Sequence, residues 1–419
     1  MVSKKKILFV HQNFPGQYKH IYKSLVKKGF DVHSLSIKKY NGDGINNHYY
    51  EILSSSNENI NQWAQEFETK MIRADSALKK CLQMRDNGFY PDLIIGHPGW
   101  GETFFMKEVW PETKLLSYVE FYYKTINCDI DFDKAVIEDD LNLDFDKFYE
   151  FTKYKLAARN SPILTSYALS DYLVSPTQFQ KNLVPKSLRG NIEVIHDGID
   201  TKILKPNPKV KISVNGKKYS KSDKIITYVS RSLDPYRGFH IFMKAIPKIL
   251  KENPDASIFI VGNEKTHGYG AEPKGGKSYK EIYYSKIKDQ IKGDEDRLFF
   301  FGHVEYDLFI KLMQISSVHI YLSYPFVLSW SMLEAMSCGA TIIGSNTDPV
   351  TEVIDDNING LLVDFFDHEG ISTNVYKVLK NRDKYKNLST NARQTIITKY
   401  DLKKVALPLH LDLINRALK

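Results

Sequence analysis

The chain has 419 residues, enough for two or three ordinary domains with sizeable cores. With 42% hydrophobic and 26% charged residues, its composition is that of a globular protein and not of a disordered one. The net charge of +8, from 58 basic and 50 acidic residues, is small and scattered, and it is not concentrated on a basic face with stacking aromatics. It therefore indicates a solvated surface, leaves attraction to an anionic membrane or to phosphorylated ligands open, and predicts no nucleic-acid partner.

Cysteine usage indicates the cellular compartment, and the hydropathy pattern argues against a membrane-spanning helix. Cys81, Cys128 and Cys338 are odd in number and form no CxxC pair, so we expect a reducing compartment and neither a disulfide framework nor a zinc site. The apolar run 7–10 near the start is too short for a signal peptide. A long uncharged stretch, 312–333, contains five serines, a histidine and Pro325, which a spanning helix would rarely carry. We expect a protein of the cytoplasm, with the inner face of the membrane left open.

Short apolar runs alternate with amphipathic helical stretches along the chain. Continuous apolar strands separated by helices are typical of parallel sheets that are covered on both faces. Two such series predict an α/β protein with two doubly wound domains. The predicted strands are 6–11, 32–37, 92–97, 114–120, 172–177 and 192–198, and then 224–230, 257–262, 297–302, 318–324, 340–345 and 360–365.

The stretch 197–224 is rich in Pro, Gly, Lys and Ser and predicts the domain boundary. It includes Asn215-Gly216, a pair that tolerates the positive φ of a tight hairpin turn. We place the first domain at 1–205, the second at 206–398, and a helix over 399–419 that packs back on the first domain. The acidic and aromatic segment 129–154 is interpreted as an insertion in the first domain.

In open α/β sheets, ligands bind beyond the carboxyl ends of the strands. Gly16 follows the first strand and opens a helix, where it would let a ligand approach the backbone. His97 ends the third strand, and Glu102 follows it within a glycine-bounded turn, so the two could exchange protons or bind hydroxyls. Ordinary strand-to-helix turns would explain the same residues.

Two loops of the second half carry stronger indications. Arg231 and Arg237 bracket a loop between a buried strand and a helix start, which is a favourable site for a diphosphate. Glu334 ends the uncharged stretch inside the short helix "SMLEAMSC", where it could accept hydrogen bonds from vicinal hydroxyls such as those of a ribose. Surface arginines and a solvated helix residue are the alternative interpretations.

The segment from Pro325 to Phe365 resembles the donor-binding region of retaining glycosyltransferases of the family 4 type, which have the GT-B fold. "YVSRSLDPYRGFHIFMKAI" is similar to the family's phosphate-binding segment, with Arg237 in the lysine position. "PDLIIGH" matches the strand that ends in the family's active-site histidine. "PFVLSWS" also looks like the version found in a bacterial subgroup that carries "FVHQNFPGQ", "HPGWGE" and "PYRGFH" and lies among glycosyltransferases of cell-surface polysaccharide synthesis.

The resemblance implies a metal-independent transferase that moves a sugar from a nucleotide-diphosphate sugar to a glycan or lipid-linked acceptor with retention. It implies no cofactor, catalytic roles for His97, Glu102, Arg231 and Arg237, and peripheral membrane contact as one option. Gly16 is expected to bind the nucleotide-sugar donor as well. One departure is Phe326, which stands where the family has its first glutamate, so the sugar contacts would come from Ser329, Trp330 and Ser331 around the helix start or from the first domain.

Three alternatives stay open. Asp-x-Asp pairs within 129–146 imitate the metal motif of the other common glycosyltransferase fold, although no apolar strand precedes them. A GT-B epimerase or phosphorylase would share the architecture. A non-catalytic nucleotide-sugar-binding protein would explain Phe326.

Overall fold

The computed structural model describes residues 4–57, 59–264 and 268–419, which form two compact units. The first unit comprises Met1–Ile126, Tyr149–Asp197 and Lys403–Lys419, and the second comprises Asn127–Phe148 and Gly198–Leu402. After a first passage at Asn127–Phe148, the chain enters the second unit again at Gly198, ahead of the predicted boundary at 205. Most of the segment expected as an insertion in the first domain belongs to the second unit, and that expectation was wrong. Asp129, Asp133 and Asp140 of this segment form hydrogen bonds or ion pairs with residues of the second unit.

A seven-stranded sheet forms the centre of the first unit, and every pairing in it is parallel. The strand order is β3-β2-β1-β4-β5-β6-β7, so the winding direction reverses between β1 and β4. The strands are β1 (Lys6–Val10), β2 (Asp31–Ser36), β3 (Ile45–Tyr49), β4 (Leu93–Gly96), β5 (Lys114–Tyr118), β6 (Tyr172–Ser175) and β7 (Ile192–Val194).

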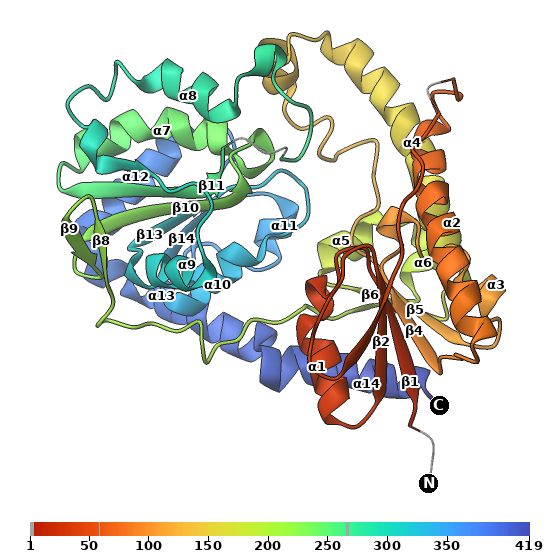
Figure 1. Ribbon diagram of the computed structural model, residues 1–419. Helices are drawn as coiled ribbons and strands as arrows, with labels where there is room; N and C mark the ends of the chain where they lie inside the picture. The colour runs from red at the N-terminus through yellow and green to blue at the C-terminus, as the bar shows by residue number, and fades with distance from the viewer. Residues whose placement is uncertain (1–3, 58, 265–267) are drawn as a thin grey trace. The chain divides into compact units, whose positions relative to one another are not determined.

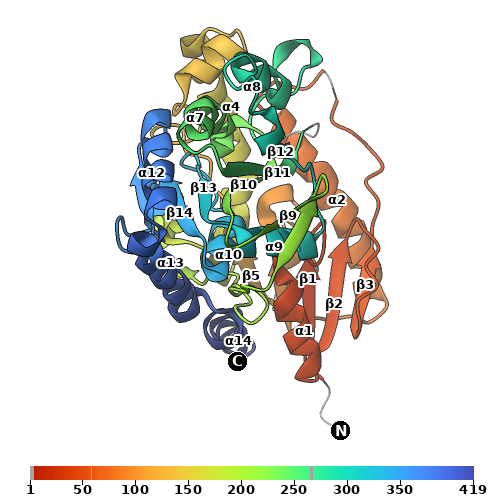
Figure 2. The ribbon, with the colours of Figure 1, turned by 90° about the vertical axis from the view of Figure 1, so that its left-hand side faces the viewer.

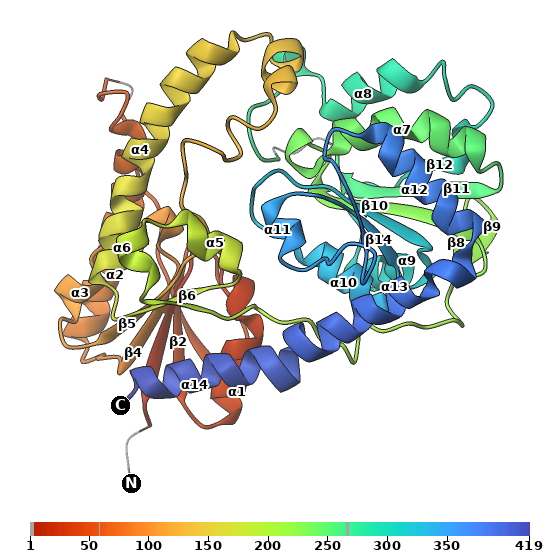
Figure 3. The same ribbon diagram turned by 180° about the vertical axis from the view of Figure 1, so that it is seen from behind.

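Helices cover both faces of this sheet, because successive strand residues point to opposite sides. Ile7 and Phe9 of β1 face one apolar cluster with α1 and α14, while Leu8 and Val10 face another with α2 and α3. Figure 3 shows α1 and α14 side by side, although they come from opposite ends of the chain. The helices are α1 (Lys19–Lys27), α2 (Gln65–Asp86), α3 (Met106–Val109), α4 (Phe145–Leu169), α5 (Gln178–Leu183), α6 (Lys186–Arg189) and α14 (Leu407–Ala417).

The second unit repeats the arrangement with a six-stranded parallel sheet of order β12-β11-β10-β13-β14-β15. Its winding direction reverses between β10 and β13. The strands are β10 (Lys224–Ser232), β11 (Ala256–Asn263), β12 (Leu298–Phe300), β13 (Val318–Tyr321), β14 (Thr341–Ser345) and β15 (Leu361–Val363). The two sheets confirm the predicted α/β class with two doubly wound domains.

Helices α7 and α12 pack together on one side of this sheet, and α9, α10 and α13 lie on the other (Figures 1 and 2). An antiparallel hairpin of β8 (Lys211–Val214) and β9 (Lys217–Ser220) packs near α9, and Asn215 and Gly216 adopt positive φ in its turn. The helices are α7 (Phe239–Glu252), α8 (Tyr279–Ile287), α9 (Tyr306–Ile315), α10 (Trp330–Cys338), α11 (Asp348–Thr351), α12 (His368–Lys380) and α13 (Arg382–Thr395).

The long uncharged stretch of the sequence is mostly buried within the second unit. It contains the end of α9, the fully buried strand β13, the following loop and the start of α10. Within the described parts of the chain, no helix combines the length and the apolar character that crossing a bilayer requires.

Candidate functional site

A pocket of about 630 Å³ lies in the second unit at the carboxyl end of β10. Parallel strands expose unpaired backbone groups at this edge, and the winding reversal leaves room beside them. Arg231 comes from the end of β10, while Ser329, Trp330, Ser331 and Glu334 come from the start of α10. The pocket therefore brings together five of the seven residues that the sequence proposed as donor-binding, while Gly16 and Arg237 do not line it.

Helix α10 presents Glu334 to the pocket. The helix begins after Ser329, whose side chain accepts a hydrogen bond from the Ser331 N–H, and it ends at Gly339 with φ 81°. Glu334 is 9% exposed, and its Oε1 accepts a hydrogen bond from the Tyr306 hydroxyl at 2.7 Å. Burial raises the pKa of the Glu334 carboxyl, and the bond from Tyr306 offsets part of that rise. The carboxylate is thus held at one oxygen and faces a cavity wide enough for a ligand.

The two predicted arginines occupy different environments. Arg231 is exposed and lines the pocket. Arg237 is only 6% exposed and donates hydrogen bonds to Ser323 Oγ at 2.9 Å and to the Val327 carbonyl at 2.8 Å. Its guanidinium also lies 5.7 Å from the ring centre of Phe326. Arg231 is therefore placed to contact a ligand in the pocket, while Arg237 holds the loop between β13 and α10.

Phe326 packs inside an aromatic cluster and does not project from the loop. Its ring lies 5.3 Å from that of Tyr236 and 4.7 Å from that of Tyr269. This apolar residue can occupy the position because the neighbouring side chains are aromatic. Phe326 thus shapes the loop that precedes Ser329.

In the first unit, His97 lies at the end of β4 and is 2% exposed. Its Nδ1 accepts a hydrogen bond from the Gly99 N–H at 3.2 Å, which places the ring proton on Nε2. Nε2 lies 3.1 Å from Oε2 of Glu120, a residue that follows β5 and has a half-exposed side chain. The ring stacks on Trp100, with centroids 4.2 Å apart. His97 and Glu120 thus form an oriented acid–base pair at the strand ends.

Gly16 and His11 complete this cluster. The His11 ring is 5.5 Å from that of His97, and burial, with a further contribution from His97, lowers the pKa of His11 to about 3. Gly16 has φ +46°, and a Cβ added there would lie 2.7 Å from the His11 ring. A glycine at position 16 is therefore required for the close packing over His11.

Glu102 has a hydrogen-bond partner of its own, and it is near enough to His97 for that residue to lower the pKa of its carboxyl in part. It is 1% exposed and accepts a hydrogen bond from the Tyr50 hydroxyl at 2.8 Å, and burial raises the pKa of its carboxyl. The sequence missed His11, Glu120 and Tyr306. Glu120 carried a signal, since it is the charged residue that ends the predicted strand 114–120, but Tyr306 sits on an ordinary amphipathic helix.

The acidic Asp-x-Asp pairs are occupied by contacts within the protein. Asp131 accepts hydrogen bonds from the backbone N–H groups of Asn127 and Cys128, and Asp144 accepts one from the Lys147 N–H. Among the described residues, no cluster of three or more His, Cys, Asp or Glu side chains could hold a metal ion.

Two family descriptions match successive parts of the chain. Residues 28–204 match the "Glycosyl transferase family 4 group", and residues 211–395 match "Glycosyl transferases group 1". The chain belongs to the GT-B glycosyltransferases. The arrangement of one matched family in each half agrees with the two Rossmann-like sheets.

Curated relatives of this glycosyltransferase are distant. It is 26% identical over 239 residues to an uncharacterized glycosyltransferase of Methanocaldococcus jannaschii, over 56% of each chain. It is 23% identical to the spore coat protein SA of Bacillus subtilis, over 52% of this chain and 58% of that one. The matches thus span little more than half the length of these relatives.

Solved structures share the fold of this glycosyltransferase over nearly its whole length. Sucrose-phosphate synthase from Thermosynechococcus elongatus superposes with a TM-score of 0.72 at 14% identity, over 99% of both chains. HepE of Anabaena, solved with UDP and glucose, gives 0.65 at 14% identity over 98% of this chain and all of that one. HepE has also been solved with UDP-glucose.

Proposed function

We propose that the protein transfers a sugar from a nucleoside-diphosphate sugar to a hydroxyl group of a glycan or lipid-linked acceptor. The observation that carries this proposal is the convergence of Arg231, Ser329, Ser331 and Glu334 on one pocket of the second unit. A cation, a helix start and a buried carboxylate match the three parts of such a donor, namely diphosphate, sugar and ribose. Since HepE, which shares the fold, binds UDP and UDP-glucose, UDP is the nucleotide to test first.

The residues have distinct proposed roles. Glu334 accepts hydrogen bonds from the ribose hydroxyls, and Arg231 neutralises the diphosphate. The backbone N–H groups at the start of α10 stabilise the negative charge that develops on the leaving group. We propose that these groups act without a divalent metal ion and that no cofactor takes part.

The proposed reaction retains the anomeric configuration. The acceptor hydroxyl attacks the anomeric carbon on the face from which the nucleoside diphosphate departs. The bond from that carbon to the phosphate oxygen breaks as the bond to the acceptor oxygen forms, and the acceptor proton passes to the departing phosphate. His97, oriented by Glu120, and Gly16 belong to the substrate-binding strand ends of the first unit in this proposal.

The cellular role that we propose is the synthesis of bacterial cell-surface polysaccharide. A cytoplasmic enzyme that uses lipid-linked acceptors would work at the inner face of the membrane. Sequence motifs such as "HPGWGE" support this assignment, since the subgroup that carries them is associated with that pathway.

A panel of nucleoside diphosphates and their sugars tests the proposal. A ligand that binds only the folded protein raises the melting temperature, so UDP and at least one UDP-sugar should stabilise the protein in a concentration-dependent way. The stabilising sugar nucleotide should then release nucleoside diphosphate on incubation, alone or with glycan acceptors. A panel without any stabilising nucleotide would overturn the proposal.

A binding protein without catalysis is the second candidate, and Phe326 is the observation in its favour. Phe326 offers no acceptor atom where the family places a sugar-binding glutamate. Saturable binding of a nucleotide sugar with no hydrolysis or transfer after prolonged incubation would favour this candidate.

A further inference from the structure

The segment Asn127–Phe148, here called the strap, comes from the first half of the sequence but folds as part of the second unit. Three of its acidic side chains, those of Asp129, Asp133 and Asp140, pair with residues more than a hundred positions away. The Tyr236 hydroxyl donates to Asp129 Oδ2 at 2.9 Å, and Lys286 Nζ lies 3.0 Å from Asp140 Oδ1. The strap is thus fixed to the second unit by specific polar contacts.

Asp133 is a deeply enclosed carboxylate of the strap, with a side chain that is 3% exposed. Its Oδ2 accepts hydrogen bonds from His240 Nε2 and from the Tyr324 hydroxyl, both at 2.8 Å, and its Oδ1 accepts one from the Val136 N–H at 3.2 Å. Burial raises the pKa of Asp133, but these hydrogen bonds outweigh it and hold the pKa below its ordinary value. The carboxylate therefore stays ionised and joins three donors.

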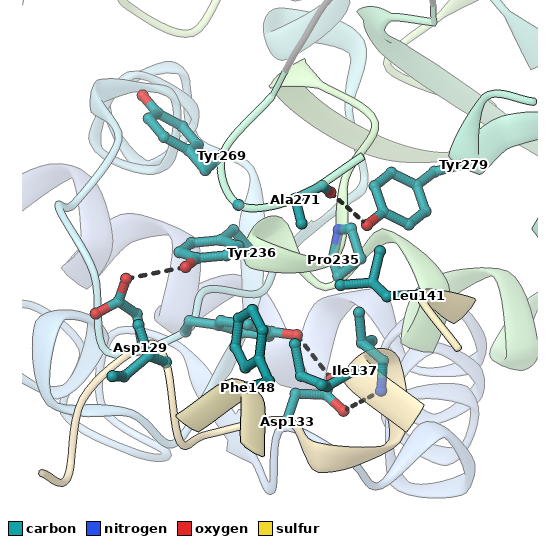
Figure 4. Close-up of a pocket in the computed structure, with 14 residues that line it drawn as sticks. Asp129, Asp133, Ile137, Leu141, Phe148, Pro235, Tyr236, Tyr269, Ala271 and Tyr279 are labelled. Atoms are coloured by element: carbon teal, nitrogen blue, oxygen red, sulfur yellow. Dashed lines mark hydrogen bonds between the residues drawn. The ribbon is translucent and has the colours of Figure 1, made fainter. Parts of the chain in front are cut away.

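Apolar packing surrounds this carboxylate. The Phe132 ring lies 4.9 Å from that of Tyr324 and 5.0 Å from that of Phe365. Figure 4 shows strap residues, among them Ile137, Leu141 and Phe148, arranged around a cavity that faces Pro235 and Tyr236. This cavity measures about 50 Å³, which is room for about one or two water molecules and too little for a sugar. The strap is consequently a packed layer and not the wall of a second ligand pocket.

The groups that the strap holds lie in the loops after β10 and β13, which adjoin the parts of the proposed donor pocket lined by Arg231 and Ser329. Tyr236 lies in the turn Pro235–Arg237 after β10, and His240 follows it at the start of α7. Tyr324 lies in the loop after β13, and its N–H donates to the Tyr236 carbonyl at 2.9 Å. A continuous set of contacts thus runs from the strap to both loops.

The same contacts continue to the start of α10. Arg237, next to Tyr236, donates to the Val327 carbonyl, and the Ser329 N–H donates to the Tyr321 hydroxyl at 2.8 Å. Ser329 is the residue that caps α10 and lines the pocket. A displacement of Tyr324 would consequently move the loop that leads to Ser329.

We propose that Asp133 is a positioning residue, which through Tyr324 and His240 fixes the loop from Leu322 to Ser329 in the form that binds the sugar of the donor. The proposal rests on the proposed function. It gives the strap, which comes from the first half of the sequence, a role in shaping the donor pocket of the second unit. Asp133 acts on the sugar side of the pocket, because Tyr324 and Phe326 precede Ser329, whereas Arg231 and Glu334 belong to other parts of the wall.

An aspartate is required at position 133 because three donors meet there. Asparagine has the same shape but only one acceptor oxygen. If that oxygen faces His240 and Tyr324, the amide nitrogen faces the Val136 N–H, and if it faces Val136, the amide nitrogen faces His240. Asp133→Asn therefore loses part of the network in either orientation without leaving a large cavity.

The test compares Asp133→Asn, Tyr324→Phe, the double variant and Asp139→Asn in the full-length protein. Asp139 is an exposed carboxylate on the same strap, so its variant controls for the change in charge. Three quantities are measured for each, namely hydrogen exchange of the amides in 322–331, UDP affinity by calorimetry, and the kcat and KM of UDP-sugar turnover. Tyr324→Phe removes a single hydroxyl and keeps the test valid if Asp133→Asn folds poorly.

Asp133→Asn should accelerate exchange in 322–331 and lower kcat/KM on the order of 100-fold, mainly through kcat. UDP affinity should change by less than about threefold, since UDP carries no sugar. The double variant should be no worse than Asp133→Asn alone, because both changes break one network. Asp139→Asn should match the unmodified protein.

Unchanged exchange and turnover in Asp133→Asn would overturn the proposal. An equal loss of UDP affinity and turnover together with a lowered melting temperature would also overturn it, because general destabilisation would then explain the result. If the unmodified protein turned over no UDP-sugar, the proposed function would fail, while the exchange of 322–331 would still decide whether Asp133 holds the loop.

Discussion

Glu334 combines two properties that act against each other. Its carboxyl is buried, which raises its pKa and makes the ionised form costly in the folded protein, yet ligand binding requires the ionised form. A carboxyl whose pKa is raised on folding stabilises the protein fully only below its unfolded pKa of about 4.3. That contribution is lost as the pH rises through the folded pKa. At neutral pH, Glu334 therefore trades stability for binding.

Glu334→Gln should expose this trade. Glutamine does not ionise and can still accept the Tyr306 hydrogen bond, so the variant should melt at a higher temperature than the unmodified protein at pH 7–8, and the gain should vanish near pH 4. UDP affinity should fall about 10- to 100-fold, because a charge-assisted hydrogen bond is worth roughly 1.5–3 kcal/mol. Thermal unfolding and calorimetry across this pH range measure both effects. A variant that melts lower at neutral pH and binds UDP normally would contradict the assignment.

The two arginines should also separate by experiment. Arg231 is exposed in the pocket, so Arg231→Ala should weaken UDP binding about 10- to 100-fold with little change in melting temperature. Arg237 is buried and donates to Ser323 and Val327, so Arg237→Ala should lower the melting temperature with little change in UDP affinity. Calorimetry and thermal unfolding of both variants check this. Equal effects on stability would show that the environments of the two arginines are alike.

At the scale of elements, the helix α7 depends on a glycine that precedes it. Gly238 has φ +67°, and a Cβ added there would lie 2.3 Å from the Leu322 Cβ, which cannot move without the backbone. Gly293, also in the second unit, has φ +91° and open space around it. Alanine at either position would be strained by the positive φ, but only alanine at position 238 would also overlap a neighbour. Comparing the two substitutions therefore separates backbone strain from steric overlap.

Gly293→Ala should destabilise the second unit by about 1–2 kcal/mol, the cost of a left-handed alanine. Gly238→Ala should cost about 2–5 kcal/mol, since overpacking against Leu322 adds about 1–3 kcal/mol. Calorimetric unfolding compares the two variants within the same transition. The kcat/KM of UDP-sugar turnover should fall in Gly238→Ala alone, because Leu322 begins the loop that leads to Ser329, while UDP affinity should change little in either variant. Equal destabilisation by both substitutions would contradict this, because it would mean that Leu322 and the loop after β13 can move aside at no cost in free energy.

The strands show what the sequence could and could not predict. Every predicted strand is present, because buried parallel strands leave continuous apolar runs. β3 was missed, since "INNHY" is polar and lies at the sheet edge. The placement of the strap was predicted wrongly for another reason. The strap belongs to the second unit because of pairs such as Asp133 with His240, which lie 107 positions apart. A pattern within a short stretch of sequence cannot indicate such a pair.

At the scale of the whole molecule, both sheets place their winding reversal at one pair of neighbouring strands, β1 and β4 in one unit and β10 and β13 in the other. The candidate residues gather at the carboxyl ends of these strands. Arg231 and Glu334 could be predicted because each stood out against an apolar background in the sequence. His11 and Glu120 could not be joined to His97 before the order of β1, β4 and β5 was known, since that order brings them together.

The stereochemistry of transfer tests the mechanism for the molecule as a whole. If the departing diphosphate leaves from the face that the acceptor attacks, an α-linked donor gives an α-linked product, and proton NMR of the new linkage should show it. Turnover should also persist in an excess of chelator, because Arg231 and the backbone N–H groups at the start of α10 would carry the leaving-group charge. A β-linked product would exclude same-face attack even if UDP bound as proposed. Complete loss of turnover in chelator, restored by Mg²⁺ or Mn²⁺, would instead assign the leaving-group charge to a metal ion and leave the same-face route intact.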